Sequence, residues 1–136
     1  MASGIYLQGY EHNINNISSR LASWVNFMHL KELKESNLSN IRVDNSLSKT
    51  GTAIFIEGCV NNTISNSMIA YADQGIYANS YLSTEGLLVN NTTIAFVNKA
   101  VNLDESTFVS INNCILDFIT NRGVYATLGK NLVVSN

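Results

Sequence analysis

A short pattern recurs along this chain at intervals of 21 to 29 residues: an aliphatic residue, any residue, then asparagine. It occurs six times, as Ile14-Asn15-Asn16, Val43-Asp44-Asn45, Ile64-Ser65-Asn66, Val89-Asn90-Asn91, Ile111-Asn112-Asn113 and Val134-Ser135-Asn136. An alternating triplet recurs between these copies, as Ile5-Tyr6-Leu7, Val25-Asn26-Phe27, Ile54-Phe55-Ile56, Ile76-Tyr77-Ala78, Val101-Asn102-Leu103 and Val124-Tyr125-Ala126. Two patterns that alternate strictly through the chain indicate a repeat architecture.

A third pattern follows the asparagine. Aliphatic residues stand three positions after it and aromatic residues five positions after it, as in Ile69 and Tyr71, Ile94 and Phe96, and Leu116 and Phe118. Apolar residues at alternate positions are typical of a strand with one buried face. Each period therefore predicts three short strands. The chain has no proline, Asn-Gly or Asp-Gly to make hairpin turns, so we expect a coil whose strands pair in parallel with their counterparts one turn away, ~4.8 Å along the axis.

In such a coil, equivalent residues stack in columns. We expect one inner column of the triplets' first residues, Ile5, Val25, Ile54, Ile76, Val101 and Val124. The aromatic residues Tyr71, Phe96 and Phe118 are expected to form another inner column. The asparagines are expected to point inward at a bend, where their amides bond one another and the bend's backbone. This ladder comprises Asn16, Asn45, Asn66, Asn91, Asn113 and Asn136.

One period is longer than the others and has helical spacing. Between residues 27 and 37, Leu30 and Leu33 are three residues apart, and Lys31 and Glu35 are four apart. This spacing predicts a short helical insertion on the surface of that turn. His29 within it, like His12 before it, is interpreted as a surface residue with no catalytic or metal-binding role.

The pattern of turns resembles the right-handed parallel β-helix of pectin-lyase-like proteins, with an asparagine ladder after the second strand. The resemblance covers residues 4–136 and implies an all-β, right-handed, single-stranded parallel β-helix of about six rungs of ~23 residues. We expect a single β-helix domain over 1–136 that is a fragment of a longer solenoid, because a strand pattern stands at each end. A leucine-rich repeat is the alternative, but its template fails by one residue between Val43 and Asn45, and no helical pattern follows.

Composition excludes several classes of protein. Charged residues make up only 13% and the net charge is −2, so neither a nucleic-acid-binding surface nor a polybasic membrane patch is expected. No run of ~18 apolar residues is present, which argues against insertion into a membrane, and the first ten residues carry no signal-peptide pattern. Cys59 and Cys114 are interpreted as small buried hydrophobic residues, and no metal or other cofactor is expected.

The outer face of the first strand of each rung is the candidate functional surface. We expect an outward column of Tyr6, Asn26, Phe55, Tyr77, Asn102 and Tyr125, followed by a row of Gln8, Met28, Glu57, Asn79, Asp104 and Thr127. The preceding turn supplies Asp73, Gln74, Asn98, Lys99, Asn121 and Arg122. Aromatic rings stack on sugar faces and amides bond hydroxyl groups, so a polysaccharide or surface glycan is the expected partner. The predicted binding residues are Phe55, Tyr77, Asn79, Lys99, Asn102, Arg122 and Tyr125.

Glu57, Asp73 and Asp104 are the candidate catalytic residues. Glu57 and Asp104 are predicted to lie two rungs apart, roughly 9.6 Å by strand spacing, at the edge of the ~6.5–9.5 Å separation of inverting glycosidases. Asp73 is expected near Glu57, as an alternative acid in a hydrolase. In a lyase, Lys99 or Arg122 beside Asp73 supplies the neutralising cation. The aspartate cluster of calcium-dependent pectate lyases and the Asp-Asp and Gly-His-Gly motifs of polygalacturonases are absent.

The resemblance implies a carbohydrate-active protein of the lyase or glycoside hydrolase type, located outside the cell or on a virion surface. Two alternatives stay open: a glycan-binding segment of a phage tailspike or adhesin that cuts nothing, and a purely structural spacer. Whether the chain is an enzyme is not decided at this stage. The outer side of the third strand is a candidate contact surface for a homotrimer, and further solenoid rungs are candidate partners.

Overall fold

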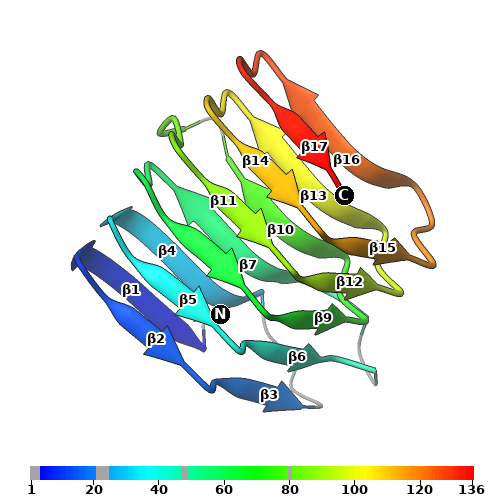
Figure 1. The fold of residues 1–136 in the computed structure, drawn as a ribbon. Coiled ribbons are helices and arrows are strands. Elements are labelled where there is room, and N and C mark those ends of the chain that lie inside the picture. The colour runs from blue at the N-terminus through cyan, green and yellow to red at the C-terminus, as the bar shows by residue number, and fades with distance from the viewer. Residues whose placement is uncertain (1–3, 21–24, 47–48, 80) are drawn as a thin grey trace.

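The computed structural model describes residues 4–20, 25–46, 49–79 and 81–136, and in these ranges every regular element is a strand. Three parallel sheets surround the interior, and each turn of the chain adds one strand to each sheet (Figure 1). The first sheet contains β1 (Ile5–Tyr10), β4 (Asn26–Lys34), β7 (Thr52–Glu57), β10 (Gln74–Ala78), β13 (Lys99–Asp104) and β16 (Arg122–Thr127).

The other two sheets consist of three-residue strands. The second sheet contains β2 (Asn13–Asn15), β5 (Asn37–Ser39), β8 (Thr63–Ser65), β11 (Leu88–Asn90), β14 (Ser110–Asn112) and β17 (Val133–Ser135). The third sheet contains β3 (Ser18–Arg20), β6 (Arg42–Asp44), β9 (Met68–Ala70), β12 (Thr93–Ala95) and β15 (Ile115–Asp117).

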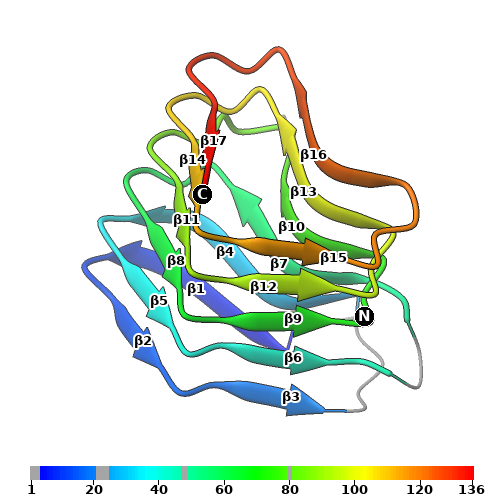
Figure 2. The ribbon, with the colours of Figure 1, turned by 45° about the vertical axis from the view of Figure 1, so that its right-hand side comes forward.

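The chain is a right-handed parallel β-solenoid of about five turns, as predicted (Figure 2). Residues paired across the first sheet give successive periods of 23, 26, 22, 25 and 23 residues, along the column Ile5, Met28, Ile54, Ile76, Val101 and Val124. Strands of a third parallel sheet follow those of the second, where a leucine-rich repeat would place its helical segment, so the β-helix describes the chain and the leucine-rich repeat does not. None of the described residues belongs to a helix of the length and apolarity needed to cross a membrane.

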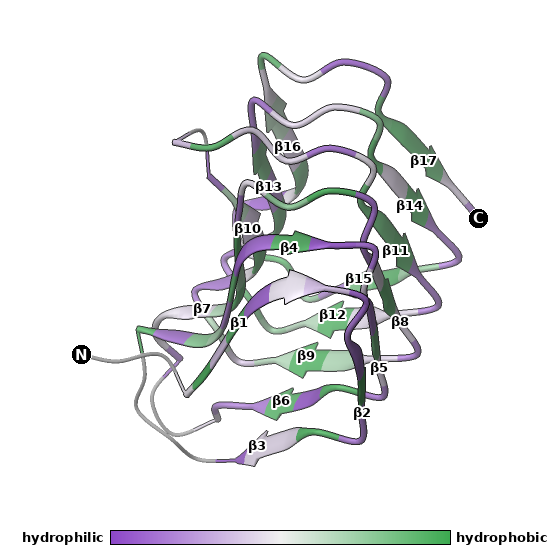
Figure 3. Ribbon diagram, turned by 90° about the vertical axis from the view of Figure 1, so that its left-hand side faces the viewer, coloured by the Kyte–Doolittle hydropathy of each residue, from purple (hydrophilic) through white to green (hydrophobic). Residues whose placement is uncertain are grey.

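Inward-facing residues of all three sheets form one apolar core. On the second sheet the middle residues of β5, β8 and β11 are fully buried, as are those of β9 and β12 on the third. Figure 3 shows this division, with hydrophobic strand segments separated by largely hydrophilic corners. Each turn covers the apolar edge of the next, which a single turn of short strands cannot do by itself.

The predicted helical insertion is wrong, because residues 26–34 form the strand β4. Met28 and Leu30 alternate inward as in any strand, but Glu32 adopts a left-handed conformation with φ 48°. This residue shifts the alternation by one position, so that Leu33 also points into the core. The three-residue spacing of Leu30 and Leu33 therefore comes from a bend in a strand. The triplet aligned with Ile54-Phe55-Ile56 is Met28-His29-Leu30.

The asparagine column is confirmed with one change of member, but its side chains do not point inward. Backbone amides place Asn16, Asn40, Asn66, Asn91 and Asn113 in one column, each donating to a carbonyl of the next turn. Asn45, predicted in this column, belongs to the corner after the third sheet, where its amide nitrogen donates to the Thr50 carbonyl at 3.1 Å. All five column members are exposed and left-handed, with φ between 49° and 58°.

Backbone conformation explains these asparagines better than a buried amide ladder. Left-handed φ is costly for most L-residues, and asparagine tolerates it because its short side chain bonds locally. Only one pair within the described column shares a side-chain hydrogen bond, from Asn91 Nδ2 to Asn66 Oδ1 at 2.7 Å. The amide that satisfies buried backbone is instead Asn62, which accepts from the Ser36 amide and donates to the Leu33 carbonyl.

The aromatic column is confirmed as a stack, but it lies on the outside. The rings of Tyr71 and Phe96 are 4.8 Å apart and those of Phe96 and Phe118 are 4.6 Å apart, with interplanar angles of 9° and 6°. All three residues have positive φ, which directs their side chains away from the core. The buried positions are taken by Ala72 and Val97, one residue later.

The interpretation of the cysteines as small apolar residues holds for Cys59, which is buried and free; burial raises the pKa of its thiol. Cys114 is half-buried and also free, and its Sγ lies 3.2 Å from the Asn112 carbonyl oxygen.

Substitution of Asn91 distinguishes the conformational role from the amide role. We expect Asn91→Ala to lower the free energy of unfolding by about 1 kcal/mol, because alanine resists left-handed φ. Asn91→Gly loses the same amide bond to Asn66 but keeps the conformation, so it is expected to be at least as stable as the parent. Urea denaturation followed by circular dichroism measures both. Equal destabilisation by the two variants would assign the stabilising role to the amide.

Candidate functional site

Five ring-bearing side chains lie in one outward column on the first sheet, which we name the ring column: Tyr6, His29, Phe55, Tyr77 and Tyr125. The rings of Tyr6 and His29 are 5.1 Å apart, those of His29 and Phe55 4.9 Å, and those of Phe55 and Tyr77 5.5 Å. Asn102 takes the turn between Tyr77 and Tyr125. The prediction is confirmed except at the second turn, where His29 stands in place of Asn26.

A row of polar side chains follows the ring column at the carboxyl ends of the strands, and we name it the carboxyl-end row. Strand register pairs Lys31 with Glu57 and Asp104 with Thr127. Asn79 follows the last paired residue of β10, and its amide bonds the Ile56 carbonyl beside Glu57. Gln8 stands at the register shift of β1. Lys31 replaces the predicted Met28, which is buried in the core. The carboxyl-end row therefore carries a cation beside Glu57, and its charge is mixed where the prediction had it acidic.

The amino ends of the strands carry a second polar row, the amino-end row, as predicted. Gln74, Lys99 and Arg122 are in register, with Asp73, Asn98 and Asn121 one residue earlier. Asn98 donates to the Asp73 carboxylate at 3.0 Å. The guanidinium carbon of Arg122 lies 3.8 Å from the centre of the Tyr125 ring, a cation–π contact. Both predicted cations thus lie beside the ring column.

Asn102 connects the ring column with the amino-end row. Its Nδ2 donates to Gln74 Oε1 at 2.9 Å. Its Oδ1 is buried and has no hydrogen-bond partner in the part of the chain that the structure describes. Because Asn102 is buried, its amide belongs to the packing of the sheet and is not an accessible contact for a ligand, contrary to the prediction.

Glu57 is mostly buried and is held by two basic side chains. Its Oε2 lies 3.1 Å from His29 Nε2 and 4.0 Å from Lys31 Nζ, and 11% of its side chain is exposed. His29 is therefore no isolated surface residue, contrary to the prediction, because it bonds the first candidate carboxylate and packs between two rings. The sequence signal for this outward position was that His29 stands between two apolar residues, Met28 and Leu30.

Asp104 has both oxygens engaged. Oδ1 accepts a hydrogen bond from Thr127 Oγ1 at 2.6 Å, and Oδ2 accepts one from the Tyr77 hydroxyl at 3.2 Å. Partial burial, and then the negative charge of Asp104, raise the pKa of Tyr77 above its ordinary value. The Asp104 carboxylate thus orients the hydroxyl end of one ring in the column.

A titration tests this pair. We expect Tyr77 to ionise at a higher pH than a free tyrosine, and Asp104→Asn to move that ionisation down. The folded protein keeps the Tyr77 proton longer than the unfolded chain does, so this stabilising contribution is lost as the pH rises above about 10. The difference in ultraviolet absorbance between the parent and Tyr77→Phe isolates this group. A Tyr77 pKa at or below the ordinary value would contradict the expectation.

The structure separates the three candidate catalytic carboxylates. Glu57 and Asp104 lie in one row with Asn79 between them, which gives roughly 9.6 Å by strand spacing. The expectation that Asp73 lies near Glu57 is wrong. Gln74 pairs with Thr52, so Asp73 is at the start of its strand and Glu57 at the end of the neighbouring one, about 20 Å away by the rise per residue. Asp73 belongs with Asn98 and Lys99.

A hollow continues the carboxyl-end row around the corner of the first three turns. It is lined by Gln8, Gly9, Tyr10, Glu32, Lys34, Gly58 and Val60. Gln8 donates to Glu32 at 2.9 Å, and Lys34 Nζ donates to the Tyr10 hydroxyl at 3.3 Å. Among the described residues, no three His, Cys, Asp or Glu side chains are grouped so that they would hold a metal ion. The first sheet thus combines rings, amides and charges without a metal cluster in the described ranges.

Comparison of the chain with protein-family models, with curated proteins and with solved structures gives no significant match.

Proposed function

We propose that this chain binds a polysaccharide or surface glycan along the outer face of the first sheet. The observation that carries the proposal is the ring column, which the carboxyl-end row follows and which the amino-end row borders beside Tyr77, Asn102 and Tyr125. The resemblance of the coil to pectin-lyase-like proteins and phage tailspikes supports the same partner and a location outside the cell or on a virion.

The chemistry of the face suits sugars. Aromatic rings offer apolar faces to the C–H groups of a pyranose. The hydroxyl groups of the sugar then remain free to bond polar side chains beside the rings. The amides of Asn79 and Gln74 each carry a donor and an acceptor. Lys99 and Arg122 at one edge supply positive charge for an acidic substituent. Because the face extends across a six-stranded sheet, it matches a linear polymer better than a compact metabolite.

Catalysis is the second candidate function, and the spacing of Glu57 and Asp104 favours it. The separation of roughly 9.6 Å leaves room for a sugar and a water between two carboxylates, as in an inverting hydrolase. A lyase would use the other edge, where Asp73 lies beside Asn98 and Lys99. Both carboxylates of the hydrolase arrangement are already bonded within the protein, and for that reason we place binding first.

Affinity electrophoresis against a panel of neutral and acidic polysaccharides tests the binding proposal. We expect at least one polysaccharide to retard the protein, and Phe55→Ala and Tyr77→Ala each to weaken that binding by about 10-fold, or ~1.4 kcal/mol. Tyr81→Ala is the matched control, because Tyr81 is a highly exposed tyrosine outside the ring column. Retardation that is insensitive to both ring-column variants would remove this face as the binding site.

Cleavage is tested separately, with reducing ends as the readout for hydrolysis and unsaturated products as the readout for elimination. If hydrolysis occurs here, Glu57→Gln combined with Asp104→Asn should abolish it while binding persists. Asn79→Ala, at the residue directly after the strand between them, should reduce it by much less. Hydrolysis that survives the double substitution would exclude the Glu57 and Asp104 site.

A further inference from the structure

The outer face of the third sheet carries opposite charges at its two ends. The middle residue of each of the three-residue strands β6, β9 and β12 points towards the core. Register places the first residues in one column, Ser18, Arg42, Met68, Thr93 and Ile115, and the third residues in another, Arg20, Asp44, Ala70, Ala95 and Asp117. In the second column Ala70 and Ala95 are buried, and the exposed side chains are Arg20 and Asp117 at its two ends.

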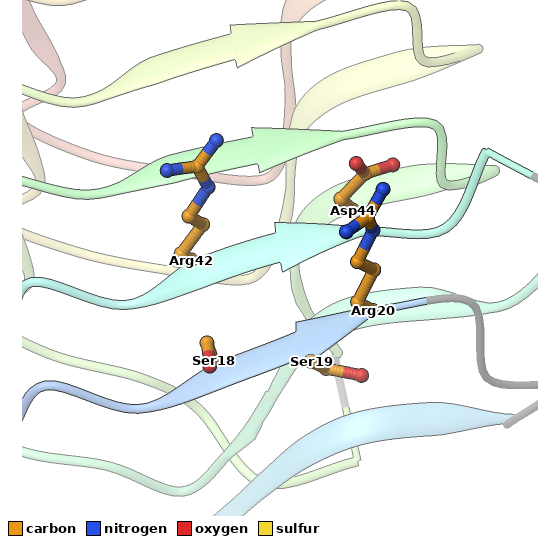
Figure 4. A pocket seen from close by; sticks show the side chains of 5 residues that line it. All are labelled: Ser18, Ser19, Arg20, Arg42 and Asp44. Carbon is orange, nitrogen blue, oxygen red and sulfur yellow. The ribbon is translucent and has the colours of Figure 1, made fainter.

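At the amino-terminal end of this face, two arginines line a hollow together with Ser18, Ser19 and Asp44. Arg20 and Arg42 extend in the same direction from the neighbouring strands β3 and β6 (Figure 4). Both are exposed, and neither guanidinium group has a hydrogen bond or ion pair with another described residue. Two guanidinium groups against one carboxylate leave the hollow with positive charge, which suits a carboxylate from outside.

From its centre to the opposite end the same face is apolar and then acidic. Met68 on the central strand is 43% exposed, and Ile115 on the last strand is 61% exposed. The stacked rings of Phe96 and Phe118 border this part of the face. Asp117 is exposed, and its side chain accepts a single hydrogen bond from the described residues, from the Phe118 amide at 2.9 Å. Exposed apolar side chains gathered on one face, with charge at its rim, are typical of a protein contact.

The placement of the two charged ends is self-complementary. The central strand of this sheet is β9, and Arg20 and Asp117 stand in the same column, each two strands from it. A twofold axis parallel to β9 exchanges the two ends when two copies face each other. It brings Arg20 of each copy opposite Asp117 of the other and sets Met68 against its own counterpart.

We propose that the third sheet is a self-association surface, on which two copies pack face to face in antiparallel orientation and the arginine hollow of each receives Asp117 of the other. A homotrimer with its threefold axis parallel to the solenoid axis would instead place each turn of one copy beside the same turn of the other copies. Arginines would then meet arginines and Asp117 would meet Asp117. The charge pattern therefore favours the twofold arrangement.

The size of the surface sets the expected strength. Five strands at their usual spacing, with the corners beside them, cover roughly 400 Å² per copy, about half the ~800 Å² of a standard interface. We therefore expect a weak dimer that forms with a Kd on the order of micromolar to tens of micromolar and dissociates on dilution.

Sedimentation equilibrium over a wide range of protein concentration, with folding checked by circular dichroism, tests the proposal. Arg20→Asp and Asp117→Arg are each expected to weaken dimerisation at least 10-fold. The double variant with both changes should recover the parent's affinity to within about threefold, because the charges are exchanged. Arg122→Asp, which removes the same type of charge from the first sheet, is the matched control and should leave the dimer unchanged.

Oxidative cross-linking gives a second test, which does not depend on the charge variants and so remains available if they fail to fold. The background is Cys114→Ser, which removes the half-buried thiol. Position 68 lies on the proposed axis, so a protein with Met68→Cys should form a disulfide-linked dimer. Ser65→Cys, on the second sheet, should not. A monomer at every concentration, a trimeric mass, or a dimer indifferent to the charge exchange would each overturn the proposal. Binding of sulfate in the arginine hollow by a chain that stays monomeric would also overturn it.

Discussion

Replacement of Ile64 by alanine is expected to lower the free energy of unfolding by about 2–5 kcal/mol. Ile64 is fully buried at the middle of β8, between Leu38 of one turn and Val89 of the next. Removing its branched side chain leaves a cavity that borders both neighbouring turns. In a solenoid each turn is stabilised only by its neighbours, so the loss weakens two interfaces together.

Urea denaturation monitored by circular dichroism measures this effect. Ser65→Ala is the control, since Ser65 is the next residue on the same strand and faces outward; its cost should stay within about 0.5 kcal/mol. A small loss for Ile64→Ala would mean that the interior at this turn is loosely packed, which contradicts the buried column.

The second large effect is expected at Asn62. Asn62→Leu keeps the approximate size of the side chain but leaves the Ser36 amide without its acceptor. It also removes one donor from the Leu33 carbonyl, which keeps its hydrogen bond from the Val60 amide. Both groups lie at a buried corner, because Ser36 and Asn62 are almost completely inaccessible to solvent. An unsatisfied buried donor costs about 1–3 kcal/mol, so the loss at the Ser36 amide should lower the free energy of unfolding by about that amount.

Asn37→Leu provides the matched control, since Asn37 is an exposed asparagine on the strand that follows Ser36. The same substitution there should change stability by no more than about 0.5 kcal/mol. Thermal unfolding of the two variants compares them directly. If they unfold alike, the corner does not depend on the Asn62 amide.

The positions of the candidate site residues followed from the period of two in the sequence. Phe55, Tyr77, Asn102 and Tyr125 share one outward column because each stands between two apolar residues of a triplet. Glu57, Asn79 and Asp104 share a row because they lie at the same distance beyond those triplets. Parallel pairing of like strands converts equal spacing along the chain into equal position on the sheet.

The interactions within the site did not follow from spacing. The bond between His29 and Glu57 requires that residues 26–34 form a strand, and the left-handed bend at Glu32 disguises that strand as helical spacing. Asp73 was expected near Glu57 because both belong to neighbouring turns. The structure places them at opposite ends of adjacent strands, since neighbouring turns share only the residues that pair across them.

The sequence by itself determined the repeat, the parallel coil and the identity of most columns, because alternation and period depend only on the order of apolar residues along the chain. Tertiary structure decided which way the corner residues point. A positive φ at Asn66, Tyr71 and Phe96 turns their side chains outward, and that conformation is imposed by closing each turn onto the next. Composition does not reveal this choice, because asparagine and aromatic residues are compatible with either side until the backbone at the corner is known.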